Sequence, residues 1–217
     1  MPVPRDAAKG ELRVFLTLES LQPQFAAYMG TPVRARGYPP YAGQHALIIE
    51  VAPGLMIERV MDLALKADPD LEPGILFVER QFGILEIHGD DKAKLLAAGR
   101  AVLSGLGLTE SEQLAPRILF TDVIEAITDQ HAVIINRNRQ ASMVMPGETL
   151  LVCEMVPALY AAIAANEAER VAPKLTLVDV QMIGAAGRVY MSGKTEDVER
   201  GLAEIERVLA EIDGRKA

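Results

Sequence analysis

Few side chains in this 217-residue sequence are placed to do chemistry, and none forms a recognisable catalytic set. The most suggestive are an acid and a base in neighbouring positions, Glu79 and Arg80, which open the segment Glu79-Arg80-Gln81-Phe82-Gly83 between two predicted strands. In a loop, such a pair is ordinarily a solvated ion pair that contributes little to stability. Because packing does not hold loop residues, the pair is also a candidate for a functional role.

The histidines and the cysteine do not gather into a site. His45, His88 and His131 are scattered, and the first two fall in strand patterns, where we expect strand-end or surface positions rather than ligands. Cys153, the single cysteine, lies in a buried-strand pattern and is predicted to be an inert core thiol without a disulfide. No Gly-rich phosphate loop and no nucleophile elbow is present. We therefore expect that the protein is not an enzyme and that it binds neither a metal nor a cofactor.

Composition narrows the class of protein further. The net charge of −8 argues against a nucleic-acid partner bound through a basic surface. No apolar run reaches the roughly 18 residues that a membrane helix needs, and residues 1–10 lack the apolar core of a signal peptide. Half of the residues are hydrophobic and few are aromatic, so we expect aliphatic cores. The composition predicts a soluble cytoplasmic protein with no nucleic-acid or membrane partner.

The chain repeats itself once at a spacing of 104 residues, and this repeat positions the candidate residues. Without a gap, Gly43 overlies Gly147 and Pro53 overlies Pro157. Such matches are informative because backbone geometry, rather than hydrophobicity, selects turn-forming residues. Other identical pairs are Arg13 with Arg117, Thr17 with Thr121, Leu47 with Leu151, Glu50 with Glu154, Gly83 with Gly187 and Gly89 with Gly193. The chain is therefore predicted to hold two copies of one fold, as domains at 11–110 and 115–217.

Hydrophobic periodicity predicts a similar order of elements in each copy. In the first copy we expect strands at 11–18, 45–51, 74–81 and 84–88, an amphipathic piece at 22–29, and helices at 55–67 and about 90–104. In the second we expect strands at 150–155, 175–182 and 188–192, and helices at 158–171 and 195–212. This order indicates an α+β fold in which each copy is a small antiparallel sheet with helices on one face. A duplicated α+β sensor that binds a small ligand between its domains stays open as an alternative.

Longer stretches resemble a known family. HALIIEVAPG, VMDLALKA and GILFVERQFGILEIHGD in the first copy are similar to the bacterial microcompartment shell domain, and so is ETLLVCEMVPALYAAIAANEAERVAPKLTLVDVQMIGAAGRVYMSGK in the second. The extra strand that opens each copy resembles the tandem, circularly permuted members. SLQPQFAAY, VERQFG, IINRNRQ and IGAAGR resemble the gated type that stacks two trimers, as in carboxysome tandem shell proteins.

The resemblance implies both a fold and an assembly. The fold would be two tandem ferredoxin-like shell domains, and the assembly a homotrimer that forms a pseudohexameric ring and stacks face to face as six chains. It also implies a structural role in a microcompartment shell beside other shell hexamers and pentamers. The central pore of the ring would pass small metabolites.

The resemblance further implies a gate. In the resembling proteins an adjacent Glu and Arg in the pore loop swing between open and closed states, which implies this role for Glu79 and Arg80. Three arginines brought to one axis repel, on the order of 4 kcal/mol for like charges ~4 Å apart near a surface, and pairing or an outward swing relieves the repulsion. When the two copies are aligned at the 104-residue spacing, this charged pair is aligned with small, neutral residues of the second copy. The residues implied to line or support the pore are Gln81, Phe82, Gly83, Ile183, Gly184, Ala185, Ala186 and Gly187.

Three further features carry both a plain and a functional interpretation. Lys66 and Arg170 end the first helix of their copies, where a cation complements the helix dipole. In the resembling family, a basic residue in a DLALKA-like context lies at the edge of the ring and contacts the neighbouring tile, although the NEAERVA context of Arg170 departs from that pattern. The segment Ile134–Gln140 is interpreted as a polar, basic loop, which is either a solvated connection or a stacking contact between trimers.

Overall fold

The structure is a computed structural model that describes residues 10–31 and 37–216. The elements of the first half are β1 (Glu11–Leu18), α1 (Pro23–Met29), β2 (His45–Ala52), η1 (Gly54–Met56), α2 (Ile57–Ala67), β3 (Glu72–Glu79), β4 (Phe82–Gly89), α3 (Lys92–Leu106) and η2 (Glu110–Glu112). Those of the second half are β5 (Arg117–Ile124), α4 (Asp129–Asn138), β6 (Thr149–Val156), α5 (Tyr160–Val171), β7 (Thr176–Gln181), β8 (Gly187–Gly193) and α6 (Thr195–Ala210).

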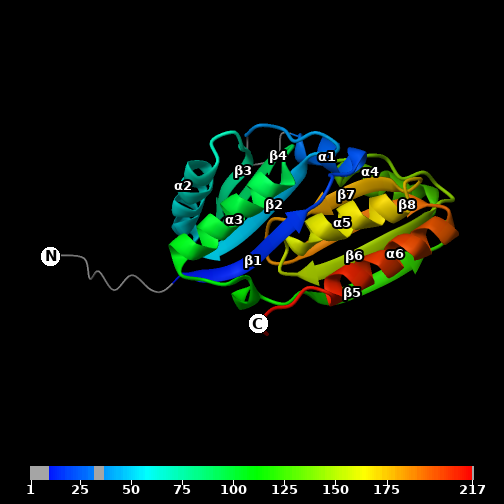
Figure 1. The fold of residues 1–217 in the computed structure, drawn as a ribbon. Coiled ribbons are helices and arrows are strands. Elements are labelled where there is room, and N and C mark those ends of the chain that lie inside the picture. Colours follow the sequence, from blue (N-terminus) through cyan, green and yellow to red (C-terminus); the bar gives the residue numbers. More distant parts are fainter. Residues whose placement is uncertain (1–9, 32–36, 217) are drawn as a thin grey trace.

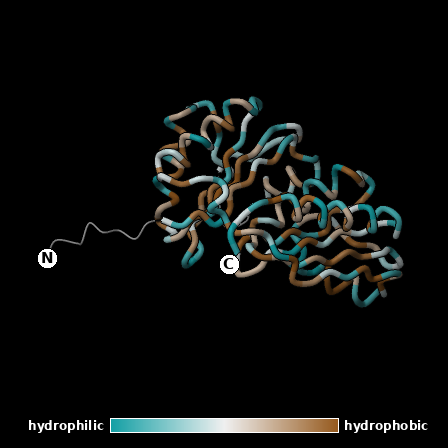
Figure 2. Tube along the Cα trace, turned by 60° about the horizontal axis from the view of Figure 1, so that its bottom comes forward, coloured by the Kyte–Doolittle hydropathy of each residue, from teal (hydrophilic) through white to brown (hydrophobic). Residues whose placement is uncertain are grey.

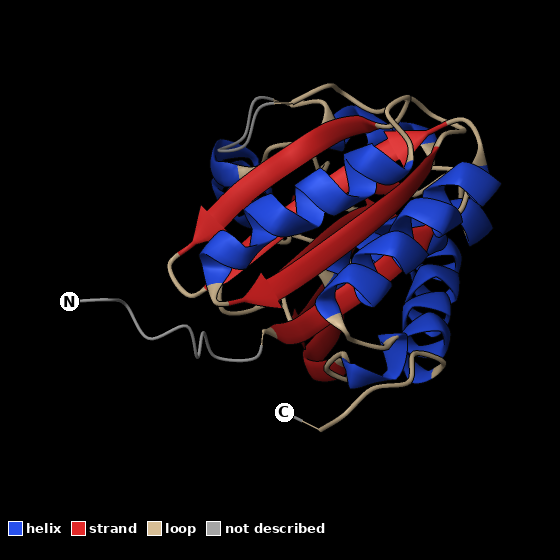
Figure 3. Ribbon diagram, turned by 60° about the vertical axis from the view of Figure 1, so that its left-hand side comes forward, coloured by secondary structure: helices blue, strands red, loops and turns tan. Residues whose placement is uncertain are grey.

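Each half builds a four-stranded antiparallel sheet of the same topology. The strand orders are β1-β2-β4-β3 and β5-β6-β8-β7. In Figure 1 the two halves lie side by side, with α2 and α3 over the first sheet and α5 and α6 over the second. In Figure 3 the covering helices run roughly along the direction of the strands that they cover. This architecture confirms the predicted α+β fold with an antiparallel sheet in each copy. The expectation of helices on one face only is wrong, because α1 and α4 pack on the faces opposite to those covered by α2 and α3 and by α5 and α6.

Three hydrophobic clusters hold the layers together. One lies between the first sheet and α2 and α3, and another lies between the second sheet and α4. The largest spans both halves, because residues of β1 and α1 pack in one cluster with residues of α5 and α6. In Figure 2 the brown of hydrophobic residues runs through the interior of both halves, and the teal of hydrophilic residues gathers at turns and helix surfaces. The halves therefore form a tightly packed pair.

The repeated glycines have a structural reason in each copy. Gly43 and Gly147 adopt φ of 91° and 83°, a region that strains residues with a Cβ. At Gly83 a Cβ would lie 2.1 Å from the carbonyl oxygen of Gly54, and at Gly187 it would lie 2.2 Å from that of Ala158. The 104-residue spacing from β2 onward thus reflects backbone constraints that both copies share.

The first strand of each copy breaks the ungapped repeat. Val14 lies opposite Glu50 in the first sheet, and Phe120 lies opposite Glu154 in the second. Because Glu50 and Glu154 are related by 104 residues, Val14 corresponds to Phe120 at an offset of 106 (120 − 14). The helices α1 and α4, which begin at residues 23 and 129, share this offset.

Two of the sequence matches are therefore not structural matches. The predicted overlay of Arg13 on Arg117 and of Thr17 on Thr121 is wrong, because it uses an offset of 104 where the strands pair at 106. The two-residue difference falls between α1 or α4 and the glycine turn that precedes β2 or β6. An identical residue at the wrong register is a coincidence of composition.

The segment Ile134–Gln140, interpreted as a loop, is mostly helical. Asp129–Asn138 forms α4, so only the last two residues of the segment lie beyond the helix. Thr128 caps the helix by accepting a hydrogen bond from the N–H of His131 at 3.4 Å. The polar composition of the segment reflects the exposed face of this helix.

The histidine expectations are met in part. His45 begins β2, and its Nδ1 accepts a hydrogen bond from the N–H of Ser20 at 3.2 Å, so its predicted strand-end position is confirmed. His88, the penultimate residue of β4, is also near a strand end, but it is fully buried and not at the surface, with its Nδ1 3.0 Å from Oε1 of Glu86. Burial raises the pKa of the Glu86 carboxyl, and His88 opposes this rise. Cys153 is buried as predicted, and burial raises its pKa to about 12, which makes the thiol inert.

Candidate pore and domain seam

The charged candidate loop is a tight turn between β3 and β4. Glu79 pairs with Phe82, so Arg80 and Gln81 alone form the turn. Arg80 has a φ of 45°, whereas Gln81 does not have a positive φ, as in a type II′ hairpin that prefers glycine at its first central position. The Arg80 side chain is exposed. The two gate candidates thus lie together at the tip of a hairpin.

Phe82 and Gly83, expected in the pore loop, belong to β4 instead. Gly83 is buried and pairs with Val51 of β2, so it supports the hairpin and does not face a channel within the chain. The ring of Phe82 lies beneath the guanidinium of Arg13, with the central carbon 3.7 Å from the ring centroid. The distance fits a cation–π interaction between β1 and the base of the hairpin tip.

The corresponding loop of the second copy is open. Its strand pairing ends at Gln181 with Arg188, whereas the first copy continues for two pairs beyond the corresponding residues, Phe77 and Ile84. Gly184 in this loop has a φ of 136°. The predicted neutral pore residues of this loop are exposed or partly exposed, apart from buried Gly187: Ile183, Gly184, Ala185 and Ala186.

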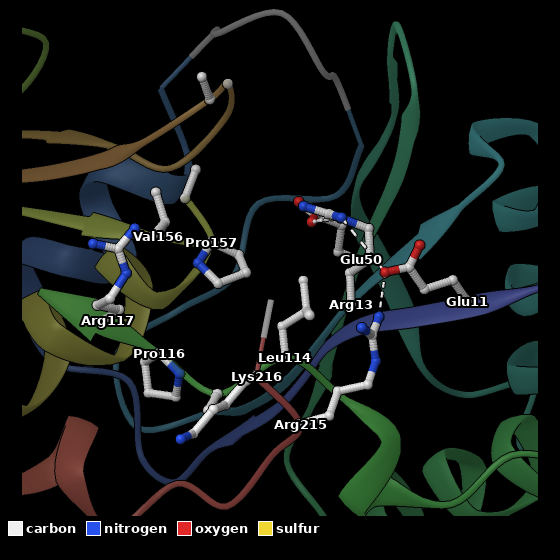
Figure 4. Close-up of a pocket in the computed structure, with 14 residues that line it drawn as sticks. Glu11, Arg13, Glu50, Leu114, Pro116, Arg117, Val156, Pro157, Arg215 and Lys216 are labelled. Carbon is white, nitrogen blue, oxygen red and sulfur yellow. Dashed lines mark hydrogen bonds and ion pairs between the residues drawn. The ribbon is translucent and has the colours of Figure 1, made fainter. Parts of the chain in front are cut away.

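A cavity of about 670 Å³ lies between the two copies, and the open loop borders it (Figure 4). Its opposite side carries Glu11, Arg13 and Glu50, with Nε of Arg13 2.7 Å from Oε1 of Glu50 and Nη1 of Arg13 3.7 Å from Oε1 of Glu11. Arg215 of the C-terminal segment also pairs with Glu11. Burial raises the pKa of Glu50, and Arg13 opposes this rise. The buried carboxylate therefore depends on Arg13 for its charge.

The two copies meet along a seam between α1 and α5, and α5 completes α1. The side chain of Gln22, the N-cap residue of α1, makes no capping hydrogen bond. Instead, the carboxylate of Glu169 accepts hydrogen bonds from the N–H groups of Gln24 and Phe25 at 2.8 and 3.0 Å, and Asn166 accepts one from Gln22 at 2.9 Å. A carboxylate at a helix N-terminus satisfies free N–H groups and complements the helix dipole. This contact was not predicted from the sequence, where its one signal is the placement of polar residues within an Ala-rich helix.

The two predicted edge cations lie in different surroundings. Arg170 donates hydrogen bonds to the carbonyl oxygens of Glu19 and Ser20, the latter at 3.1 Å, so it lies at the seam. Lys66 is exposed, and its Nζ lies 2.7 Å from Oδ2 of Asp62 one turn earlier. The side chain of Lys66 makes no contact with the second copy comparable to that of Arg170 with the first.

Within residues 10–31 and 37–216, no group of three or more His, Cys, Asp and Glu side chains is arranged to hold a metal ion. In the same part of the chain, no helix has the length and hydropathy needed to cross a membrane.

Comparison with known proteins gives the family. The model of the CsoS1D N-terminal domain matches residues 12–112. The carboxysome shell protein CcmP of Synechococcus elongatus is 42% identical over 206 residues, which are 95% of each chain. The chain belongs to the tandem-domain microcompartment shell proteins. The shell protein CsoS1D of Prochlorococcus marinus is 43% identical over 203 residues, or 93% of this chain and 78% of the relative.

Solved shell proteins share the fold along the whole chain. The double ringed trimeric shell protein MSM0271 from the RMM microcompartment has a TM-score of 0.92 and 60% identity, over 96% of this shell protein and 100% of that chain. The fused permuted hexameric shell protein MSM0275 has a TM-score of 0.89 and 48% identity, over 95% and 100%. The predicted resemblance is thereby confirmed: this is a structural component of a microcompartment shell and not an enzyme. The sensor alternative finds no support.

Proposed function

We propose that three copies of this shell protein close into a pseudohexameric ring, and that Glu79 and Arg80 gate its central pore for small metabolites. The observation that carries the proposal is that two faces are exposed in the single chain, although their counterparts in the other copy are buried. The seam between α1 and α5 is made within the chain, but the corresponding faces of the other copy, on β5–α4 and on η1–α2, carry exposed apolar residues.

The β5–α4 face exposes apolar side chains whose counterparts are buried. Val14 in β1 is fully buried, whereas its counterpart Phe120 is 55% exposed. Tyr28 in α1 is buried and donates a hydrogen bond to the carbonyl oxygen of Val180, whereas its counterpart Ile134 is 55% exposed. Exposed aromatic and aliphatic side chains at the positions of a buried interface indicate a missing partner.

The α2 face fits that partner. Leu55, in η1 directly before α2, is 75% exposed, whereas its counterpart Leu159 is fully buried. At the position where α5 carries Glu169 to cap α1, α2 carries Leu65, and α4 needs no such carboxylate because Thr128 caps it from within the same copy. An apolar residue is the appropriate choice opposite a helix whose N-terminus is already capped. The α2 face of one chain therefore matches the β5–α4 face of another.

This contact joins different faces of two identical chains, so it repeats head to tail until the ring closes. Each chain contributes two domains, and closure after three chains gives six. We take residues 11–110 and 115–217 as those domains. The trimeric ring of the similar MSM0271 supports this stoichiometry.

Divergence between the two hairpins supports the gate. In the ring, three tight hairpin tips bearing Glu79 and Arg80 alternate with three open neutral loops. Arg80 has a positive φ at the turn, so local backbone preference does not favour its conformation. Mutual repulsion of three guanidinium groups favours movement away from the axis, and pairing with carboxylates favours return. The neutral loops, with Gly184 at their centre, leave space for this movement.

The proposal extends to contacts between rings. Tyr41 and Met145 are exposed at corresponding positions of the turns before β2 and β6, so a ring would present six such side chains on one face. They support face-to-face stacking as a dimer of trimers, to which the exposed part of Ile134–Gln140 is proposed to contribute. Lys66 is the proposed tile-edge residue toward other shell hexamers and pentamers, because the guanidinium of Arg170, the other candidate, is bonded to Glu19 and Ser20 at the seam.

Crystals of Arg80→Ala test the gate. We expect the variant to keep the mass of the wild-type assembly and to show an open pore, because the repelling and pairing group is gone. Lys66→Ala, which removes a cation remote from the hairpin, is the matched control and should leave the pore as in the wild type. A pore that stays closed in every trimer of Arg80→Ala would refute the gating role.

A further inference from the structure

The hairpins β3–β4 and β7–β8 differ in how far their strand pairing extends toward the tip, and the difference lies next to Arg13. In the first copy, strand pairing continues through Val78 with Gly83 and Glu79 with Phe82. The second copy lacks both corresponding pairs. Because the two sheets share topology and register from β2 onward, a local contact must account for the extra pairs.

Arg13 makes that contact. It lies on β1, its guanidinium covers the Phe82 ring at 3.7 Å, and its Nε lies 2.7 Å from Oε1 of Glu50 on the intervening strand β2. Glu50 is only 2% exposed, so the ion pair is largely shielded from solvent and fixes the orientation of the guanidinium. Arg13 thus reaches across β2 and rests on the first residue of β4.

The second copy has no equivalent arrangement. The residue that corresponds to Arg13 is Leu119, at the offset of 106 that β1 and β5 share, and the residue that corresponds to Phe82 is Ala186. The second copy keeps Glu154, but this carboxylate pairs with Arg188. The contact and the extra strand pairs therefore occur together in one copy and are both missing from the other.

We propose that Arg13 is a positioning residue that holds the gating hairpin in its zipped form by clamping Phe82. When the phenyl ring of Phe82 moves away from the guanidinium of Arg13, the last two strand pairs lose their support. The hairpin then takes the open form of the second copy. Glu79 and Arg80 move with its tip. The clamp rests on the proposed gate for its purpose, but its effect on the hairpin can be measured without reference to the pore.

The test is hydrogen exchange, followed by mass spectrometry, of the assembled full-length protein. In Phe82→Leu, which keeps an apolar residue but removes the ring, we expect amides 78–83 to exchange about tenfold faster than in the wild type, as expected for the loss of one cation–π contact. Phe82→Tyr keeps the ring and should restore slow exchange. Arg188→Gln, which breaks the ion pair with Glu154 in the second copy, is the matched control and should leave these amides unchanged.

Three results would decide the matter. Exchange in Phe82→Leu within twofold of the wild type would overturn the clamp. Acceleration that spreads equally to β8 would also overturn it, because it would report general destabilisation and not release of the hairpin. Faster exchange confined to the hairpin supports the clamp, even if crystals of the same variant show an unchanged pore, and in that case only the gate would be refuted.

Discussion

Replacing Phe120 with aspartate should dissolve the proposed ring. Phe120 is 55% exposed in the single chain, and its counterpart Val14 is fully buried at the seam. Of the roughly 200 Å² of a phenylalanine side chain, about 110 Å² would be buried on assembly, worth about 3 kcal/mol at ~25 cal/mol per Å². This is about a hundredfold per contact and, over three contacts, roughly a millionfold in the trimer dissociation constant. The uncompensated carboxylate adds to the loss.

Sedimentation velocity at several concentrations would measure the effect. We expect Phe120→Asp to sediment as a monomer at concentrations where the wild type is a trimer or a pair of trimers. Phe120→Leu retains most of the apolar area and is the matched control, which should assemble. An aspartate variant that assembles as tightly as the wild type would refute the assignment of β5 to the interface between chains.

Three further predictions concern stability. Glu169→Ala should lower the free energy of unfolding by about 2 kcal/mol in thermal or urea denaturation, since it leaves the N–H groups of Gln24 and Phe25 without acceptors. Arg80→Gly should raise the melting temperature by the equivalent of about 1 kcal/mol, since glycine adopts a φ of 45° without strain. Burial raises the pKa of Glu86 above its ordinary 4.5, so the folded chain binds the proton more tightly and the free energy of unfolding falls as pH rises above 4.5. Glu86→Gln should reduce this fall, because the amide does not titrate, as calorimetry across pH would show.

Each of these predictions has a control and a contrary outcome. Glu199→Ala removes an exposed carboxylate from α6 and should cost little, so an equal loss in both variants would refute the capping role of Glu169. Gln81→Gly changes the next residue of the turn, which has no positive φ, and should destabilise. Equal effects of glycine at 80 and at 81 would contradict the strain argument. A pH profile of Glu86→Gln that matches the wild type would show that another group titrates.

Most of the fold could be predicted because backbone constraints repeat with the sequence. Gly43 and Gly147 need a positive φ, and Gly83 lies too close to a neighbouring carbonyl for any side chain. The repeat could therefore be recognised from these positions in a single sequence. The two-residue change of register at β1 and β5 was not, because strand residues on a half-buried sheet tolerate many side chains. The chance identity of Arg13 and Arg117 therefore supported an offset of 104 for the first strands, where the structure has 106.

The candidate pore was predictable in place but not in form. The charged pair Glu79 and Arg80 stood out against neutral residues in the second copy. The pairing that places Phe82 in β4, and the contact of its ring with Arg13 of β1, involve residues distant in sequence, which a local pattern does not contain. The helix at Asp129–Asn138 was missed for a related reason. Ala132 and Ile135 pack on the second sheet, but Val133 and Ile134 are exposed among polar residues, so the local pattern resembled that of a loop.

The absolute mass in solution, measured by light scattering over a range of protein concentrations, tests the central claim most directly. The account predicts three or six times the 23.5 kDa of one chain, and six would support the stacked double ring. A monomer or a dimer at every concentration would contradict it, because the exposed faces on α2 and β5–α4 would then not form an interface between chains.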